Sequence, residues 1–207
     1  MHLRRRQLKA KCISTYCKAT LLSVAFFCNP MAQKTPAELQ RLSPEAFETA
    51  PKTPIRLILN DLRSHHNVGA CFRTADAFIL EKLYLCGITA TPPHRDIQKT
   101  ALGATETVAW EYHADAVALV QQLQAEGVEV WAVEQTHTAI ALQNVQMDPY
   151  KTYALVLGNE VFGVAPALLE ACTQHVEIPQ WGSKHSLNVS VCAGVVVWEC
   201  VRQLRCS

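Results

Sequence analysis

The stretch Tyr153-Ala-Leu-Val-Leu-Gly-Asn-Glu-Val-Phe-Gly-Val164 shows the pattern on which the fold prediction rests. Five hydrophobic residues follow one another without the polar alternation of a half-exposed strand, which indicates a strand buried on both faces. A glycine-bracketed turn with one carboxylate, Glu160, follows directly. Strands of this kind are typical of a parallel sheet that helices cover on both sides.

The same alternation extends along the chain. Apolar segments predict strands over 55–60, 82–87, 107–112, 128–133, 153–158 and 175–179. Helical spacing, with proline at starts and glycine at ends, predicts helices over 67–78, 115–126, 166–172 and 186–204. We therefore predict one α/β domain over 55–207, with a mostly parallel sheet and helices on both faces. The polar segment 31–54 predicts two short helices, capped by Thr35 and Ser43.

Residues 1–30 differ from the rest in charge. They carry no acid, and their bases are followed by an apolar run over 19–28 that has the size of a signal peptide. Either this is a secretory signal, or translation begins at Met31 and the segment is an upstream extension. The body carries cysteines inside apolar patterns, which favours a reducing cytoplasm and the second interpretation: Cys71, Cys86, Cys172, Cys192 and Cys200.

Composition and motifs exclude several classes of protein. Residues 31–207 hold 13 basic and 18 acidic side chains, so nucleic-acid binding would need a local basic patch. Without a C-x-x-C pair or zinc spacing we expect no metal site, and without an apolar run of about 18 residues we expect no membrane span. There is no G-x-G-x-x-G, no P-loop and no G-x-S-x-G elbow.

Three polar clusters follow predicted strands, where parallel sheets bind ligands. They are Asn67-Val-Gly-Ala-Cys-Phe-Arg73, Gly158 to Val164, and Ile178-Pro-Gln-Trp-Gly-Ser-Lys-His-Ser-Leu-Asn-Val-Ser190. Each has a purely structural alternative: Arg73 paired with Asp76 or Glu160, Glu160 in a solvated turn, and Ser186 as a helix N-cap. Asn188, expected inside the first turn of the last helix, has no such alternative.

Together, in this order, the clusters resemble the three motifs of the SpoU branch of the SPOUT RNA ribose 2′-O-methyltransferases. The resemblance runs from about Arg56 to Arg202. It implies a C-terminal deep trefoil knot, S-adenosylmethionine as cofactor, and a homodimer in which each active site uses both chains. The implied catalytic residues are Asn67, Arg73, Glu160, Ser186 and Asn188. The implied cofactor-binding residues are Val133, Glu134, Leu157, Gly158, Ile178, Gly182 and Leu187.

The resemblance also implies a mechanism in which Arg73 acts on the ribose 2′-hydroxyl, a poor nucleophile. Arg73 either takes the proton while transiently neutral, or stays charged and stabilises the developing alkoxide. We expect an RNA substrate, tRNA in preference to rRNA, and interpret the loop with Arg95 and Lys99 as facing the RNA. The alternatives are an rRNA or base methyltransferase, and a knotted RNA-binding dimer without catalysis.

Overall fold

The computed structural model describes residues 33–35 and 38–206. The chain divides into two compact units, residues 1–41 and 42–207. In the first, the backbone N–H and hydroxyl of Thr35 donate to Glu38, and a turn covers 38–40. This is the predicted capping contact, but residues 36–37 of the predicted helix lie outside the described residues. The interpretations of residues 1–30 lie outside them too.

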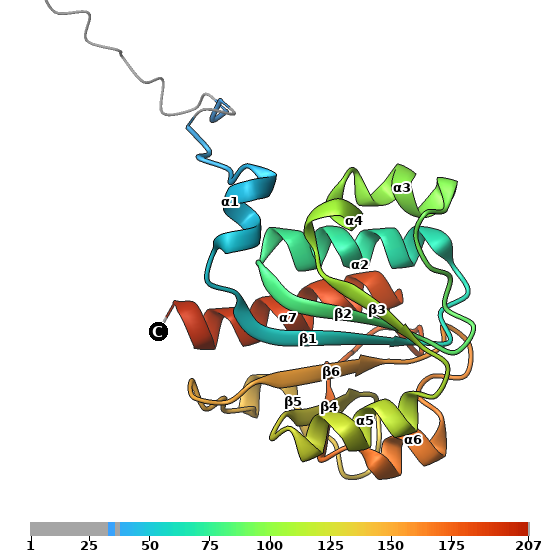
Figure 1. Cartoon of the computed structure of the whole chain (residues 1–207). Coiled ribbons are helices and arrows are strands. Elements are labelled where there is room, and N and C mark those ends of the chain that lie inside the picture. Colours follow the sequence, from blue (N-terminus) through green and yellow to red (C-terminus); the bar gives the residue numbers. More distant parts are fainter. Residues whose placement is uncertain (1–32, 36–37, 207) are drawn as a thin grey trace, which may run out of the picture. The chain divides into compact units, whose positions relative to one another are not determined.

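The second unit contains one sheet, and every strand pair in it is parallel (Figure 1). The strand order is β3-β2-β1-β6-β4-β7-β5. The predicted parallel α/β sheet is therefore confirmed. The strands are β1 (Thr53–Asn60), β2 (Leu80–Cys86), β3 (Trp110–His113), β4 (Glu129–Val133), β5 (Ile140–Ala141), β6 (Tyr153–Leu157) and β7 (Gln174–Glu177).

Helices lie on both faces of the sheet, as predicted (Figure 1). Among the described residues, none is both long and apolar enough to cross a bilayer. The helices are α1 (Pro44–Thr49), α2 (His65–Ala77), α3 (Arg95–Ala101), α4 (Ala104–Thr107), α5 (Ala116–Ala125), α6 (Pro166–Ala171) and α7 (Val189–Arg205), with a 3₁₀ turn over Leu142–Asn144.

The predicted loop with Arg95 and Lys99 is wrong, because these residues form helix α3. The side chain of His94 accepts a hydrogen bond from the Asp96 N–H and so caps this helix. The two prolines before His94 are typical of a loop, which is why the sequence predicted one here. The helix is nevertheless stabilised by packing, because Ile97 and Ala101 are both buried. Helix α4 and the short strand β5 were not predicted either.

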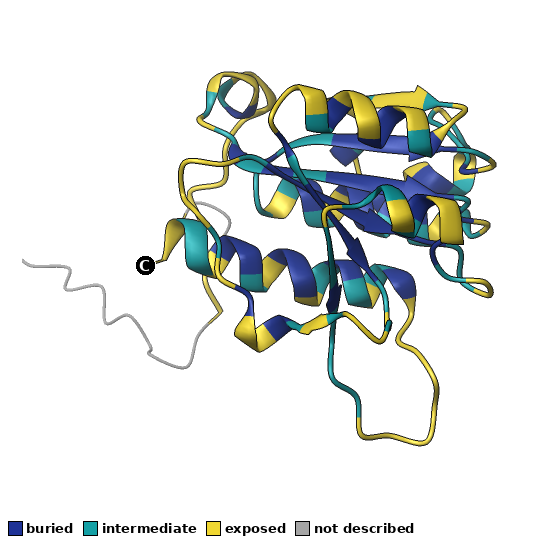
Figure 2. Ribbon diagram, turned by 90° about the horizontal axis from the view of Figure 1, so that it is seen from below, coloured by how far each residue is buried: buried dark blue, intermediate teal, exposed yellow. Residues whose placement is uncertain are grey.

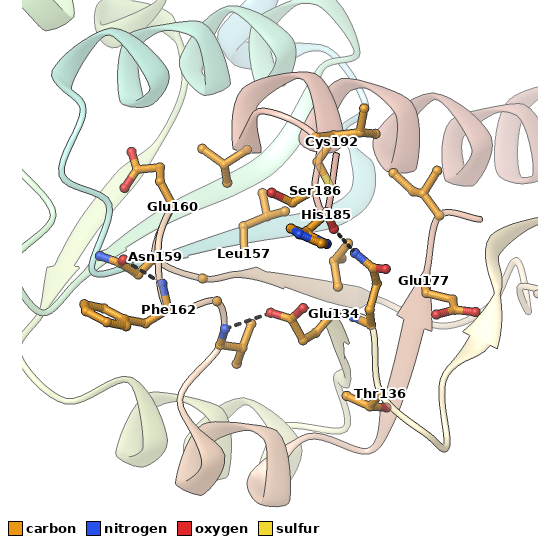
Figure 3. A pocket seen from close by; sticks show the side chains of 18 of the residues that line it. Glu134, Thr136, Leu157, Asn159, Glu160, Phe162, Glu177, His185, Ser186 and Cys192 are labelled. Carbon is orange, nitrogen blue, oxygen red and sulfur yellow. Dashed lines mark hydrogen bonds between the residues drawn. The ribbon is translucent and has the colours of Figure 1, made fainter. Parts of the chain in front are cut away.

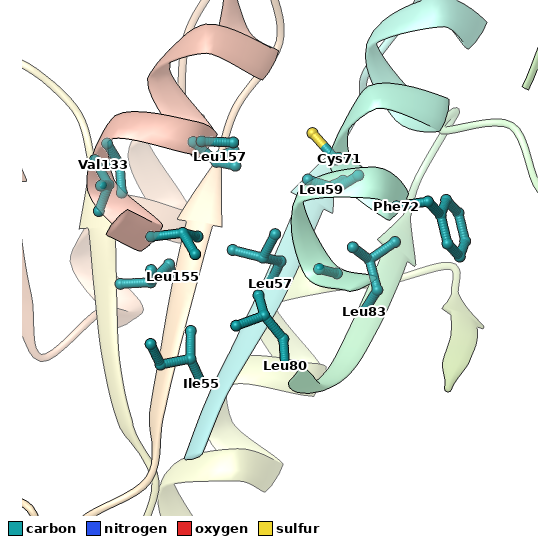
Figure 4. Packing of buried hydrophobic residues seen from close by; sticks show 14 of the residues in the cluster. Ile55, Leu57, Leu59, Cys71, Phe72, Leu80, Leu83, Val133, Leu155 and Leu157 are labelled. Atoms are coloured by element: carbon teal, nitrogen blue, oxygen red, sulfur yellow. The ribbon is translucent and has the colours of Figure 1, made fainter. Parts of the chain in front are cut away.

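The alternation of side chains along β1 divides the core into two layers. Ile55, Leu57 and Leu59 point to the layer that also holds residues of α2 and α7 (Figure 4). Ile58 points the other way, toward α5 and α6. The central strands are buried on both faces while the edge strands β3 and β5 are partly exposed, and the helices expose their outer sides (Figure 2). Full burial of the central strands explains why they lack the polar alternation of surface strands.

Helix α2 begins earlier than its predicted start at Asn67. Ser64 is the N-cap, and its hydroxyl accepts a hydrogen bond from the backbone N–H of Asn67. Gly69 therefore lies inside the helix, where α3 packs closely against it. A Cβ atom at Gly69 would lie 2.0 Å from the Thr100 hydroxyl and 2.4 Å from the Ile97 carbonyl oxygen. The glycine is required for helix packing, not for the start of the helix.

We predict that Gly69→Ala lowers the free energy of unfolding by about 1–3 kcal/mol, because the added methyl group collides with the α3 backbone. The higher helix propensity of alanine would by itself stabilise the helix by up to about 1 kcal/mol, and the predicted value is what remains after this gain. Urea unfolding of wild type and variant measures the difference in their free energies of unfolding. The control is Thr74→Ala on the same helix, which raises helix propensity without adding an atom. A variant at Gly69 as stable as the wild type would contradict the packing argument.

Candidate active site

A pocket of about 650 Å³ lies where β4, β6 and β7 end (Figure 3). Its volume is within the range of small-molecule sites, roughly 300–1,000 Å³. Three chain segments form its wall: the residues after β4, the turn after β6, and the segment between β7 and α7. The second and third contain two of the polar clusters found in the sequence, so parallel strands bring together at one sheet edge segments that are far apart in the chain.

Side-chain to backbone hydrogen bonds connect these three segments. Glu134, directly after β4, accepts from the backbone N–H of Val164 at 2.9 Å. Gln135 donates from its side-chain amide to the carbonyl oxygen of His185 at 2.9 Å. The turn after β6 is closed by a pair of backbone hydrogen bonds between Asn159 and Gly163. The pocket wall is thus held by specific bonds in addition to apolar packing.

A polar cluster at the edge of the pocket joins all three sequence clusters. The side-chain amide of Asn67 donates to Glu160 Oε1 at 3.0 Å. The side-chain amide of Asn188 donates to Asn67 Oδ1 at 3.1 Å. Asn67 comes from α2, Glu160 from the turn after β6, and Asn188 from the start of α7. We call these three side chains the amide–carboxylate cluster.

The carboxylate of Glu160 is the charged group of this cluster. Besides Asn67, it accepts hydrogen bonds from the backbone N–H groups of Arg63 and Ser64, both at 3.0 Å. Partial burial by itself would raise the pKa of Glu160, but these three donors together lower it below its ordinary value. Glu160 is therefore ionised at neutral pH, and it fixes the beginning of α2 against the turn after β6.

The structural alternative for Ser186, that it caps the last helix, is wrong. Asn188, not Ser186, is the N-cap of α7, and its side-chain oxygen accepts from the backbone N–H of Ser190 at 2.9 Å. Asn188 thus has a structural role that the sequence did not indicate. Ser186 is exposed and lines the pocket. Sequence reasoning missed Ser190, whose hydroxyl donates to Asn188 Oδ1 at 2.7 Å, although it ends the same motif.

Arg73 lies apart from the amide–carboxylate cluster within one chain. It is exposed on α2, six residues beyond Asn67, which is about 9 Å along a helix axis. Its side chain forms no hydrogen bond or ion pair with the described residues. The structural alternative, a pair with Asp76 or Glu160, is therefore not observed, and Asp76 instead accepts from the Thr107 hydroxyl at 2.8 Å.

The residues expected to bind the cofactor mostly lie around one pocket. Six of the seven line it, from three segments: Val133, Glu134, Leu157, Gly158, Ile178 and Leu187. Gly182 does not line it. Phe162 and Asn159, which also line the pocket, were not predicted, although both belong to the motif that contains Glu160. The Cys192 thiol lies at the pocket too, and burial raises its pKa to about 11, so it is protonated at neutral pH.

The lining has the chemical character that an adenosine-containing sulfonium compound requires. The buried apolar side chains of Leu157, Val164 and Val189 offer surface for a flat ring. The carboxylates of Glu134 and Glu177 offer negative charge for a cation. No group of three or more His, Cys, Asp or Glu side chains suited to a metal occurs in the part of the chain that the structure describes.

Comparison with known proteins decides the family. The model of the SpoU rRNA methylase family matches residues 54–198, most of the chain. The chain belongs to the SpoU rRNA methylase family. This confirms the resemblance inferred from the three motifs, and the matched range contains the amide–carboxylate cluster and the pocket segments.

Curated relatives of this SpoU family chain include two bacterial enzymes named 23S rRNA (guanosine-2′-O-)-methyltransferase RlmB. The Bordetella pertussis protein is 33% identical over 77% of this chain, and the Ralstonia nicotianae protein is 36% identical over 72%. The aligned regions span only 64% and 59% of these relatives' own lengths.

Solved structures share the fold. The TrmH/SpoU tRNA modifying enzyme of A. aeolicus has a TM-score of 0.68 and 27% identity, covering 77% of this chain and 79% of that one. The AdoMet-bound rRNA methyltransferase of Sinorhizobium meliloti has a TM-score of 0.68 and 25% identity, covering 74% of this chain and 58% of that one. The arrangement of sheet and helices is thus that of SpoU methyltransferases.

We predict that Glu160→Gln lowers the free energy of unfolding at pH 7 by roughly 1 kcal/mol, because the amide nitrogen that replaces one carboxylate oxygen cannot accept and the remaining neutral oxygen accepts less strongly. Since the folded state lowers the pKa of Glu160, its stabilising contribution is complete above the unfolded pKa and disappears as pH falls through the folded one. The gap between wild type and variant should therefore narrow from pH 6 to pH 3.

Chemical denaturation across this pH range checks the prediction. Glu170→Gln is the control, because the exposed Glu170 side chain forms no hydrogen bond or ion pair with the described residues. A gap between wild type and Glu160→Gln that stays constant down to pH 3 would show that the carboxylate charge contributes nothing.

Proposed function

We propose that this protein transfers a methyl group from S-adenosylmethionine to a ribose 2′-hydroxyl of RNA. The observation that carries the proposal is the amide–carboxylate cluster, in which one residue from each of the three family motifs meets at the edge of the pocket. Membership of the SpoU rRNA methylase family and the likeness to an AdoMet-bound methyltransferase support it.

In this proposal the pocket holds S-adenosylmethionine, which supplies the methyl group when bound. Leu157, Ile178 and Leu187 would hold its adenosine part, and the carboxylate of Glu134 would favour its positive charge. These residues exclude water from one side of the donor and leave the side toward the amide–carboxylate cluster open for the ribose. The alignment of the two reactants is the main contribution of the protein.

The ribose hydroxyl then lies beside Asn188 and Ser186, and Arg73 acts on its proton. Both accounts of Arg73 remain: it takes the proton while neutral, or it stabilises the alkoxide as a cation while a neighbouring phosphate accepts the proton. The exposed Arg73 side chain, without a partner among the described residues, is available for either role. Glu160 holds Asn67 in place and so positions the ribose-binding groups.

A homodimer would bring Arg73 of one chain to the cluster of the other. An exposed apolar stripe on α7 supports this arrangement; it consists of Val191, Val195 and Trp198, each at least 40% exposed. Residues spaced in this way share one face of a helix. Helix α2, which carries Arg73, packs against α7, so contact through the stripe would bring each Arg73 close to the partner chain.

Three expectations from the sequence remain part of the proposal. The parallel order β6-β4-β7 and the packing of α7 beside α2 support the C-terminal trefoil knot. The continuous family match over 54–198 supports a methyltransferase domain over 55–207, while the short helical segment 31–54 and the extension or misassigned start 1–30 stay predictions. The cytoplasmic location is supported by six unpaired cysteines among the described residues.

We propose rRNA as the substrate, in place of the tRNA expected from the sequence. The curated relatives are 23S rRNA methyltransferases, whereas the A. aeolicus neighbour modifies tRNA. Arg63, just before α2, and Lys99, on α3, are exposed and form no ion pair with the described residues, so both are available to RNA. Arg56, by contrast, is paired with Glu81 at 2.7 Å, so it is not available to RNA.

We predict that the full chain, given tritiated S-adenosylmethionine, labels an unmodified 23S rRNA transcript and labels a tRNA pool far less. Nuclease digestion followed by chromatography should recover the label as a 2′-O-methylnucleoside. Label on a base would indicate a base methyltransferase. Binding of RNA without any label would support the non-catalytic dimer and contradict the proposed function.

We also predict that Arg73→Ala and Asn188→Ala each lower turnover at least tenfold, about 1.4 kcal/mol of barrier. Refolding the two variants together should restore about a quarter of wild-type turnover, because half of the dimers then carry one intact composite site. Co-refolded Asn67→Ala and Asn188→Ala, both in the same chain's cluster, are the control and should restore none. Equal results from both mixtures would exclude a site shared between chains.

A further inference from the structure

Phe162 is a large aromatic side chain that the structure leaves almost entirely uncovered. It is 85% exposed, although it lines the pocket and lies in the turn between β6 and α6 (Figure 3). Its ring forms no stacking contact with another aromatic ring among the described residues. The neighbouring Val161 lines the pocket too and is 67% exposed, so the two side chains form an apolar surface at the edge of a ligand site, where such surfaces bind ligands.

The turn holds Phe162 in a fixed position. The side-chain oxygen of Asn159 accepts from the backbone N–H groups of Val161 and Phe162, at 2.9 and 3.1 Å. The amide nitrogen of Asn159 donates to the carbonyl oxygen of Asp61 at 2.7 Å. Gly163 closes the turn with φ +68°, and a Cβ there would lie 2.3 Å from Glu134. The backbone under the ring is therefore well ordered before any ligand binds.

Groups that suit a nucleotide lie on the segments connected to the turn that carries Phe162. Glu160, only two residues away and so within about 7 Å of chain, holds Asn67 beside Asn188. The backbone N–H of Arg63 also donates to Glu160, and the exposed Arg63 guanidinium forms no hydrogen bond or ion pair with the described residues. A cation, a pair of amides and an aromatic ring thus belong to segments that meet at Glu160, and their chemistry matches phosphate, ribose and base.

We propose that Phe162 is a stacking platform for the base of the nucleotide that is methylated, with Arg63 contacting its phosphate. This inference rests on the proposed function and specifies how that site takes an unpaired nucleotide. Stacking of splayed bases on aromatic side chains is the usual way in which proteins bind single-stranded RNA. The adenine of the cofactor is less suited to stack on Phe162. The pocket offers adenine a buried apolar wall at Leu157 and Val164, whereas the Phe162 ring is exposed to solvent.

The test compares three substitutions at Phe162 in the full-length protein. Phe162→Ala should raise KM for the RNA transcript about tenfold, equivalent to about 1.4 kcal/mol, with little change in kcat. Phe162→Leu should raise KM almost as much, because leucine restores apolar bulk but offers no aromatic face. Phe162→Tyr should stay within about twofold of wild type. The transcript is whichever of the rRNA and tRNA samples the wild type methylates.

Tyr150→Ala is the matched control. Tyr150 is 95% exposed and precedes β6, whereas Phe162 follows it, so the two aromatic rings lie at opposite ends of the same strand. Its removal should leave KM unchanged. Calorimetric titration with S-adenosylmethionine and light scattering of each variant measure cofactor binding and oligomeric state, both of which should equal those of the wild type.

The other outcomes overturn the inference in distinguishable ways. Weaker binding of S-adenosylmethionine by Phe162→Ala would assign the ring to the cofactor site, and dissociation into monomers would assign it to a subunit interface. Wild-type KM in Phe162→Ala and Phe162→Leu would remove the stacking role while leaving the proposed function intact. A wild-type protein that methylates neither RNA would contradict the proposed function itself.

Discussion

The carboxylate of Glu160 is the contact on which the candidate site depends. It accepts hydrogen bonds from two backbone N–H groups before α2 and from the side chain of Asn67 within it, and so joins α2 to the turn after β6. The same bond orients Asn67 toward Asn188 at the start of α7. Glu160 thus joins two segments directly and the third, at the start of α7, through Asn67. Charge-assisted hydrogen bonds of this kind are stronger than neutral ones, which suits a site that must position two reactants.

The sheet determines why these segments meet. All strand pairs are parallel, so the loops after β1, β4, β6 and β7 leave from the same edge, and the helices that cover both faces keep that edge free. Close packing adds further constraints. Gly69 allows α3 to lie against α2, and Gly158 allows the turn after β6 to close, since a Cβ there would lie 2.3 Å from the backbone of Gly163. The glycines of these motifs are therefore needed because they let two backbone segments pack closely.

The buried strands could be predicted from the sequence, whereas several helix starts and the exposure of Phe162 could not. Buried strands such as 153–157 were predicted because continuous apolar runs have few alternatives in an α/β chain. The predicted starts of α2 and α7 were wrong. Ser64 and Asn188 are the N-caps, but Asn67 and Ser186 nearby have a similar preference for capping, so the sequence could not distinguish them. Helix α3 was missed because its cap is a histidine, an uncommon choice, directly after two prolines. Phe162 was missed because exposure depends on neighbours that a motif does not specify.

The sequence by itself determined the family, the parallel α/β class and the residues of the candidate site, because apolar periodicity and ordered motifs are local properties of the chain. The tertiary structure alone decided that Asn67 bonds to both Glu160 and Asn188, that Arg73 lies away from them in one chain, and that Phe162 stays exposed. These facts depend on how the loops at one sheet edge pack against each other. Such packing is set by the whole fold, so no single stretch of sequence contains it.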